Sequence, residues 1–384
     1  MEWKLKDLTV DGKGSYGIGA PAVPYQEDKL TYLRITDIND DGSLNFSDLK
    51  SVDAEDAEKY ILKENDIVFA RTGNSTGRSY FYEKQHGTFV YAGFLIKFSL
   101  DPNKVNPRIL KYYTHSKPYF DWVNSFDTGA TRGNINAKTY GDMEIELPSR
   151  KVQDKIVSIL SSLDRKIELN NKINADLEEM AQAIFKNWFV DIEPFKDGKF
   201  VDSELGMIPE GWKVGTLGEL CNFKRGKNLL TKNAIDEGVP VVAGGLEPSC
   251  YHNIANTGAP VITVSGSGAN AGFMRMYHVP VWASDCSFID ISCENFYFVY
   301  CFLKVNSKLL KHAQTGAVQP HVKPSDIHDF ELVIPDKESI YDFQDKVKPF
   351  FDKIALIQKE NSRLSLLRDT LLPRLMSGEL EVPE

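Results

Sequence analysis

The stretch "FDTGATRGNINAKTYGDMEIELP" at residues 126–148 has a second version, "AQTGAVQPHVKPSDIHDFELVIP", at residues 313–335. The Thr-Gly-Ala that begins at Thr128 corresponds to the one that begins at Thr315, and Pro148 corresponds to Pro335 at the same offset of 187 residues. Each version ends in an alternating segment, "DMEIELP" or "DFELVIP", which predicts a strand stopped by proline. The repetition indicates that the chain contains one structural unit twice.

The start of this unit also recurs. Trp3-Lys4-Leu5 with Leu8 corresponds to Trp212-Lys213-Val214 with Leu217, inside "LGMIPEGWKVGTL" at residues 205–217. A second start past the middle of a 384-residue chain fits two domains, because one hydrophobic core rarely serves a chain of this length.

A long helical pattern follows each version of the repeat. Apolar residues recur every three or four positions from residue 152 to 184 and again from residue 343 to 371. This spacing predicts two helices of about 35 residues, each roughly 50 Å long, that form an antiparallel coiled coil. The alternative is a pair of ordinary helices that face a core. The predicted seam contains Ile156, Leu163, Ile167, Leu177, Val347, Ile354, Asn361 and Leu364.

Polar and proline residues interrupt this pattern. Asn170 or Asn174 on the first helix and Asn361 on the second would lower stability but fix the register of the pair. We expect Pro349 to start or kink the second helix and Pro373 to end it, because proline lacks the backbone N–H that a helix interior needs.

The order along the chain is therefore globular domain, long helix, globular domain, long helix, with the two domains as pseudo-repeated copies. We assign residues 1–149 to a first domain, 150–190 to a helical spacer, 191–211 to a linker, 212–336 to a second domain and 337–384 to a second helical spacer. An antiparallel helix pair would relate the domains by a pseudo-twofold axis and hold two recognition surfaces at a fixed separation. That arrangement suits two short DNA sites with an unread spacer between them.

The composition limits the classes of protein. The formal net charge of −9 weighs against a nucleic-acid partner, but a local basic face can coexist with an acidic total. The longest apolar run, "FYFVYCFL" at 296–303, is too short for a membrane span and predicts a buried helix or strand. The N-terminus has no signal-peptide pattern. Five cysteines without a C-x-x-C predict reduced thiols in the cytoplasm rather than disulfides or a zinc site.

Polar glycine-rich loops carry the candidate DNA contacts. "DIVFARTGNSTGRSYFY" (66–82) and "VITVSGSGANAGFMRMY" (261–277) each predict a strand, a loop and a strand. Arginine pairs with guanine, asparagine pairs with adenine, and hydroxyls hold phosphates, whereas the alternative is a solvated hairpin turn. "CNFKRGKNLLTK", "TRGNINAK" and "VQPHVKP" are basic or polar stretches for which we keep two alternatives, contact with DNA or capping of the following strand. The candidate residues are Arg71, Thr72, Asn74, Ser75, Thr76, Arg78, Arg132, Asn134, Lys138, Lys224, Arg225, Lys227, Ser265, Ser267, Asn270, Arg275, Gln319, His321 and Lys323.

The sequence offers no catalytic or metal-binding set. "DIEPF" (191–195) lacks the second proline of an adenine methyltransferase motif, and "PDKE" (335–338) stands where a helix is expected to start. The seven histidines show no ligand spacing, and no phosphate-binding G-x-x-x-x-G-K-[ST] occurs. We expect no cofactor on this chain.

Several segments together resemble the specificity (S) subunit of type I restriction-modification systems. They are "LGMIPEGWKVGTLGEL", the "RTG" turn at 71–73, "VSGSGANAGFMRMYHVPVWASDCSFI" (264–289), "NWFVDIEPF" (187–195) and "LLPRLMSGEL" (371–380), with the paired Thr-Gly-Ala segments. The similarity covers essentially the whole chain, and the order of the segments is more specific than any one of them.

The resemblance implies the fold class α/β (α+β): two target-recognition domains, each with a twisted and largely antiparallel sheet, that each read one half of a bipartite, asymmetric double-stranded DNA site. It also implies that the helical regions set the spacer and bind two modification (M) subunits, and that restriction (R) subunits join where the system cleaves DNA. S-adenosylmethionine, ATP and Mg²⁺ would then belong to those partners, and the S subunit would not be an enzyme.

One position departs from the resemblance. We align Ser265-Gly266 with Thr72-Gly73, so that Val264 stands in place of Arg71. Direct arginine contact from this spot is then not expected in the second domain, and Arg275 or the "KRGK" stretch would substitute.

A protein–protein adaptor of the same two-domain shape is the alternative function. Salt dependence separates the two hypotheses, because contacts to several phosphates weaken steeply as salt rises, whereas apolar contacts do not.

Overall fold

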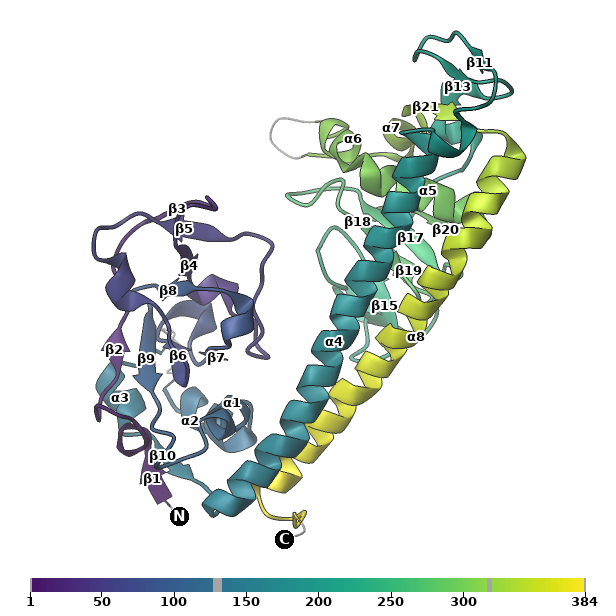
Figure 1. The fold of residues 1–384 in the computed structure, drawn as a ribbon. Coiled ribbons are helices and arrows are strands. Elements are labelled where there is room, and N and C mark those ends of the chain that lie inside the picture. The colour runs from purple at the N-terminus through teal and green to yellow at the C-terminus, as the bar shows by residue number, and fades with distance from the viewer. Residues whose placement is uncertain (1, 127–132, 316–319, 383–384) are drawn as a thin grey trace. The chain divides into compact units, whose positions relative to one another are not determined.

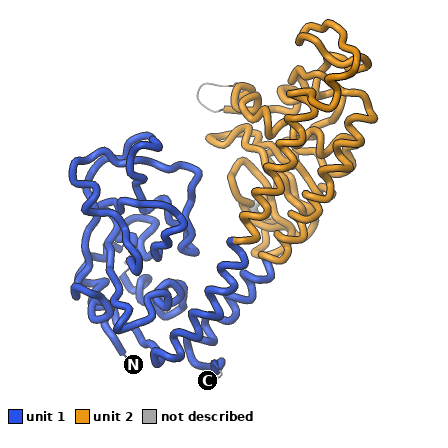
Figure 2. Tube along the Cα trace, in the orientation of Figure 1, with its two compact units in different colours: residues 1–168, 362–384 blue, residues 169–361 orange. Residues whose placement is uncertain are grey.

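The computed structural model describes residues 2–126, 133–315 and 320–382. The chain divides into two compact units, one formed by residues 1–168 and 362–384 and the other by residues 169–361 (Figure 2). Each unit holds one α/β domain together with parts of both long helices. Within the described residues, no helix is long and apolar enough to cross a membrane.

The two long helices, α4 (Arg150–Phe189) and α8 (Lys337–Met376), each contain 40 residues and pack side by side (Figure 1). Asp164 contacts Arg368 in the first unit, and Asn170 contacts Asn361 in the second. Residue numbers thus rise along one helix while they fall along its neighbour, which confirms the antiparallel pairing. At 1.5 Å per residue each helix spans roughly 60 Å, longer than the sequence pattern indicated.

The seam asparagine of α4 is Asn170. Its side chain is 1% exposed, and its amide nitrogen donates to Asn361 Oδ1 at 2.7 Å and to Glu360 Oε2 at 2.8 Å. Asn361 in turn donates to Asn171 Oδ1 at 2.8 Å. These directional bonds between the helices satisfy the buried amide and favour one register of the pair.

The expected start of the second helix at Pro349 and its expected end at Pro373 are both wrong, and the alternative of a kink at Pro349 stays a prediction. Pro349 does not start α8, which begins twelve residues earlier at Lys337, and Pro373 does not end it, because the helix continues to Met376. Pro349 and Pro373 are exposed, so the carbonyls that lose a partner can bond to water. The carbonyl of Pro373 itself accepts from Ser377 N–H at 3.0 Å, and apolar packing of Leu372 and Leu375 holds the last turn in place.

The apolar face of the long helices serves the domains as well as the helix pair. Ile156 is fully buried in the core of the first unit, while Val347 and Ile354 lie in the core of the second. Leu177 packs against that second core, and the remaining apolar seam candidates, Leu163, Ile167 and Leu364, are half-buried. The helices are thus both partners of each other and core-facing helices of the two units.

In the first domain, β1 (Glu2–Lys4) pairs with β10 (Glu144–Glu146), the strand that ends the repeat. One antiparallel sheet has the order β2 (Ser15–Tyr16), β9 (Leu95–Ser99), β6 (Asp66–Ala70), β7 (Ser79–Phe81). A second sheet has the order β3 (Ala22–Pro24), β5 (Lys50–Val52), β4 (Thr31–Leu33), β8 (Phe89–Tyr91), with β4 and β8 parallel. The helices are α1 (Arg108–Tyr113), α2 (Lys117–Asn124) and α3 (Ala137–Gly141).

The second domain repeats this topology. β13 (Lys213–Thr216) pairs with β21 (Glu331–Ile334), and the antiparallel sheet has the order β14 (Lys224–Arg225), β20 (Cys286–Asp290), β17 (Val261–Ser265), β18 (Met274–Tyr277). The smaller sheet contains β16 (Cys250–His252), β15 (Val239–Val242) and β19 (Trp282–Ala283). The helices are α5 (Phe296–Val305), α6 (Ser307–His312) and α7 (Pro324–His328). The matching strand orders confirm the duplication that the sequence predicted.

Residues 191–211 between the first long helix and the second domain are not without structure. β11 (Phe200–Val201) and β12 (Ile208–Pro209) form a small antiparallel hairpin there. At the other long helix, Asp336 Oδ1 accepts from Ser339 N–H at 2.9 Å. The "PDKE" carboxylate at this position therefore stabilises the start of α8, as the sequence predicted.

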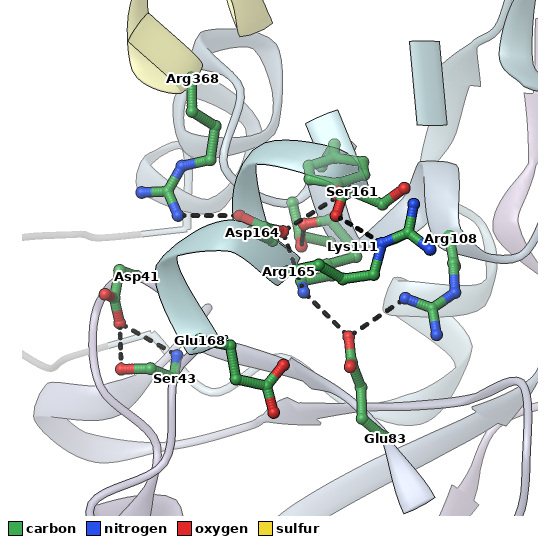
Figure 3. Close-up of polar contacts among 12 residues, drawn as sticks. Asp41, Ser43, Glu83, Arg108, Lys111, Ser161, Asp164, Arg165, Glu168 and Arg368 are labelled. Carbon is green, nitrogen blue, oxygen red and sulfur yellow. Dashed lines mark hydrogen bonds and ion pairs between the residues drawn. The ribbon is translucent and has the colours of Figure 1, made fainter. Parts of the chain in front are cut away.

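Charged residues fasten the first domain to both long helices. Asp164 on α4 pairs with Lys111 of α1 at 3.1 Å and with Arg368 of α8 at 3.1 Å, and it accepts from Tyr112 Oη at 3.0 Å (Figure 3). Lys111 and Arg108 also pair with Glu83, which lies after β7. We name these five charged residues, Asp164, Lys111, Arg368, Glu83 and Arg108, the Asp164 cluster. Burial alone would raise the pKa of Asp164, but the charges and donors of Lys111 and Arg368 hold it below its usual range.

A histidine lies beside this cluster. Burial lowers the pKa of His115 to about 4, with Arg368 and Lys111 acting in the same direction and Asp41 and Asp164 opposing them. Gly42, at φ +73°, lets the loop close over the ring, because a Cβ there would lie 2.6 Å from His115 Nε2. The imidazole is therefore neutral in the folded unit at pH 7.

In the second unit, aromatic side chains pack the two long helices against the domain. Phe185 of α4 and Phe343 of α8 lie together with Phe298 of α5, with ring centroids 5.3 and 5.6 Å from Phe185. Tyr297 stacks on Phe351 at 5.0 Å. The "FYFVYCFL" run thus forms the buried helix α5, one of the two structures that its composition allowed.

Candidate nucleic-acid interface

The predicted strand–loop–strand segments are antiparallel hairpins with matching backbone hydrogen bonds. Ala70 N–H donates to Arg78 O in the first domain, as Ser265 N–H donates to Phe273 O in the second. Gly73 and Gly268 both adopt positive φ, +73° and +80°, at the corresponding point of the loop. The two hairpins therefore share one turn geometry that glycine permits.

Several hydroxyl and charged groups of the first hairpin form hydrogen bonds to other groups of the same domain. Ser75 is buried, and the Thr76 hydroxyl donates to Gly73 O at 2.8 Å and to Gly133 O at 3.0 Å. Arg78 donates to Asp40 Oδ1 at 2.6 Å and to Ile38 O at 3.0 Å. Thr76 thus stabilises the turn and Arg78 ties the hairpin to residues 38–40, whereas Asn74 is exposed at the tip and Thr72 is half-buried beside it.

Arg71 follows β6 directly and lies over an aromatic ring. Its guanidinium carbon is 5.0 Å from the centroid of Tyr16, a residue of the edge strand β2, and its Nε donates to Asn134 Oδ1 at 3.3 Å. The Tyr16 ring and the Asn134 amide are both uncharged. They therefore orient the guanidinium without neutralising its charge. Arg71, Tyr16 and the exposed Asn134 thus form a small polar surface beside the turn.

The segment after Gly133 has a capping role. The side chain of Asn136 accepts from Thr139 N–H at 2.9 Å and caps α3, while Lys138 on that helix is exposed. Arg132 lies outside the described residues. The sequence left DNA contact and capping of the following strand open for this stretch, but Asn136 caps a helix, because α3 precedes the strand β10.

In the second hairpin the polar side chains are again engaged with the protein. Ser265 is buried and donates to Gly244 O at 3.2 Å, and Asn270 donates to the same oxygen at 3.4 Å. Ser267 donates to Asp285. Arg275 lies over the ring of Tyr277 at 5.1 Å and pairs with Glu247 at 2.9 Å.

The hydrogen-bond register corrects the alignment of the two turns. Arg71 N–H donates to Phe94 O, and Gly266 N–H donates to Asp285 O, while Ile135 and Val322 donate to the carbonyls of Arg71 and Gly266. Gly266, not Val264, therefore occupies the position of Arg71, and Ser267-Gly268 corresponds to Thr72-Gly73. The sequence alignment was wrong by two residues because it matched "SG" with "TG" and could not see which strand residue lies opposite which.

The basic stretch of the second domain forms the edge strand β14. Arg225 corresponds to Tyr16, since Gly226 N–H bonds to Cys286 O as Gly17 N–H bonds to Leu95 O. Arg225 pairs with Asp285, and Lys224 and Lys227 are exposed on either side. A Cβ on Gly226 would lie 2.1 Å from Ser284 O, so only glycine permits this close approach.

The remaining candidates of the second domain lie next to the turn. His321 corresponds to Asn134 and forms isolated bridges with Ser267 and Thr315. Lys323 is exposed and precedes α7, where its backbone N–H donates to Asp326 Oδ2 at 2.8 Å. Gln319 lies outside the described residues.

Sequence reasoning missed two members of these surfaces, Tyr16 and Asp285. Tyr16 lies far along the chain from the first hairpin and reaches it through the pairing of β2 with β9, whereas Asp285 follows the second hairpin closely and directly precedes β20. A signal existed in the shared glycine of "SYG" and "KRG", which places Tyr16 and Arg225 at the same point of the repeat.

The structure thus contains two related α/β domains, each with a polar turn that has an arginine beside it, together with a pair of antiparallel helices. A family model described as the type I restriction modification DNA specificity domain matches residues 15–179 and 209–366. The chain belongs to this family and is a DNA specificity subunit of a type I restriction-modification system, which is not itself the catalytic subunit.

Individual relatives agree with this assignment. The chain is 31% identical over 299 residues to the type I restriction enzyme MjaIX specificity subunit of Methanocaldococcus jannaschii, covering 72% of this chain and 69% of that one. It is 25% identical to the HindI specificity subunit of Haemophilus influenzae, covering 84% and 88%. A crystal structure of a type I S subunit from M. genitalium has the same fold, with a TM-score of 0.55, 19% identity and coverage of 100% and 96%.

Proposed function

We propose that each α/β domain reads one half of a bipartite, asymmetric site in double-stranded DNA and that the α4–α8 pair sets the spacer. The observation that supports this most is the duplicated hairpin surface. The two domains keep the same turn geometry but carry different side chains around it, as expected if each reads a different half-site.

The partners follow from this function. The long helices bind two modification subunits, which carry S-adenosylmethionine and methylate adenine, and restriction subunits with ATP and Mg²⁺ join where the system cleaves. The chain acts in the cytoplasm, where its DNA is found.

The test is co-expression of the chain with its modification subunit, followed by modification-sensitive long-read sequencing of the host DNA. The proposal expects a split motif with methyladenine in both halves. A methylated but undivided motif would overturn the assignment of one half-site to each domain.

Absence of new methylation, with the two proteins shown to associate, would favour the adaptor alternative. Affinity measured against salt separates the two further. DNA binding that neutralises several phosphates falls by orders of magnitude between 50 and 200 mM salt, whereas an adaptor held by apolar contacts changes little.

A further inference from the structure

One spatial position in the two domains is filled by arginines from different strands. In the first domain Arg71, at the end of β6, lies over Tyr16 of β2. In the second domain the corresponding residues are Gly266 and Arg225. The arginine has moved from the strand beside the turn to the edge strand, and glycine stands at its former position.

The side chain of Arg225 fills the space that a residue at 266 would take. A Cβ built on Gly266 would lie 2.8 Å from Arg225 Nη1 and 3.2 Å from its Cζ. Arg225 would have to leave this position to admit a larger residue at 266. Each domain thus has a guanidinium at this position, supplied by the residue after β6 in the first domain and by the edge strand β14 in the second.

The two guanidinium groups differ in their surroundings. Arg71 contacts neutral groups, the Tyr16 ring and the Asn134 amide. Arg225 contacts the carboxylate of Asp285, whose other oxygen accepts from the Ser267 hydroxyl. The side chain of Arg225 is 47% exposed and that of Asp285 is 31% exposed, so both can meet a ligand.

A carboxylate in this place disfavours phosphate as the partner of Arg225. Like charge repels the DNA backbone, whereas a base edge carries no net charge and presents donors and acceptors. A guanidinium fixed by one carboxylate keeps its remaining N–H groups in a defined plane, which suits the O6 and N7 acceptors of guanine.

We infer that Arg225 is the base-reading residue of the second domain, that it pairs with guanine, and that Asp285 is its positioning residue. This inference rests on the proposed function and adds the residue and base that decide specificity in one half-site. Arg225 takes the role that Arg71 has in the first domain.

The experiment compares methylation motifs and DNA affinity for the complex of the full chain with its modification subunit. Arg225→Ala should lose selection at one G·C pair of the second half-site, with discrimination there falling by about tenfold to a hundredfold. Arg225→Lys should do the same in part, because an ammonium cannot pair bidentately. The first half-site should be unchanged. Lys227→Ala, which removes an exposed candidate contact on the same stretch, is the comparison variant: it should weaken binding to all DNA sequences alike and leave the bases of the motif unchanged.

Variants of Asp285 separate a positioning role from a merely structural one. Asp285→Asn should reduce discrimination at the same base pair while strengthening binding to DNA that lacks the half-site, because a negative charge is removed. Asp285→Glu should restore part of the discrimination.

The failures of the two proposals are distinguishable. If the wild-type complex writes no split motif, the proposed function is wrong. If it writes a split motif and Arg225→Ala leaves the second half-site as selective as before, the inference is wrong and the function stands. If Arg225→Ala and Lys227→Ala lose the same discrimination at the second half-site, the inference is also wrong, because that pattern indicates general electrostatic attraction.

Discussion

Replacing Asp164 by asparagine tests how the first domain is fastened to the long helices. Its carboxylate is 17% exposed and holds Lys111 and Arg368, which are 29% and 27% exposed, as well as the Tyr112 hydroxyl. Removing one partner of a fully buried pair costs about 3–5 kcal/mol, and an exposed pair contributes about 0–1 kcal/mol. The Asp164 pairs are partly exposed, and an asparagine at this position can still accept one hydrogen bond. We therefore expect an intermediate effect: Asp164→Asn should lower the free energy of unfolding of the first unit by about 2 kcal/mol.

Hydrogen exchange measures this effect unit by unit. Amides of α1 and of the neighbouring part of α4 should exchange about 30-fold faster at pH 7, which is the equivalent of about 2 kcal/mol, while amides of the second unit should not change. Asp121→Asn is the matched control in the same unit. Its pair with Lys117 is exposed, at 60% and 81%, so its loss should change exchange by less than about twofold.

The pH dependence supplies a second check with a definite sign. The folded pKa of Asp164 is depressed, so its stabilisation is fully present above the ordinary aspartate pKa and is lost as pH falls through the folded pKa. The difference between wild type and Asp164→Asn should therefore be constant above about pH 5 and shrink below about pH 4. A variant that behaves like Asp121→Asn, or a difference that grows in acid, would refute the role assigned to the Asp164 cluster.

Three further predictions concern other parts of the chain. Arg71→Ala should relax selection in the first half-site alone by about 1–3 kcal/mol, measured from the methylation motif, and an unchanged motif would make the turn structural only. His115 has a folded pKa of about 4, so the first unit should lose up to about 3 kcal/mol of stability as pH falls from about 6.5 to 4, because the unfolded chain binds the proton first. His115→Gln should abolish that slope in denaturant titrations, and a slope that persists would contradict the assignment. Replacing Asn170 and Asn361 together by leucine should raise the stability of the helix pair by about 1–3 kcal/mol. It should also permit misregistered or intermolecular pairing, which sedimentation would detect. Unchanged stability together with a single monomeric species would count against a register role.

The helical pattern and the duplication were legible in the sequence because they depend on local periodicity. Spacings of three and four residues specify a helix face wherever the chain lies, and α4 and α8 follow them even through Pro349 and Pro373. The hairpins were likewise predicted from glycine-rich loops between apolar strands, and both formed.

The individual site residues were harder to assign. Ser75, Thr76 and Ser265 were candidates by residue type, but each hydroxyl or side chain turns inward to satisfy the loop. A hydroxyl bonds to backbone as readily as to phosphate, so residue type alone does not decide between them. Their direction depends on loop geometry set by neighbouring glycines.

By itself the sequence determined that this protein has two related α/β domains, two long paired helices and a polar turn in each domain. Only the tertiary structure decided that Gly266 corresponds to Arg71, that Arg225 supplies the missing guanidinium, and that Asp285 holds it. The physical reason is that register arises from hydrogen bonds between strands distant in the chain. The two domains differ in the lengths of the segments between those strands, so matching letters do not reveal which side chains share a position in space.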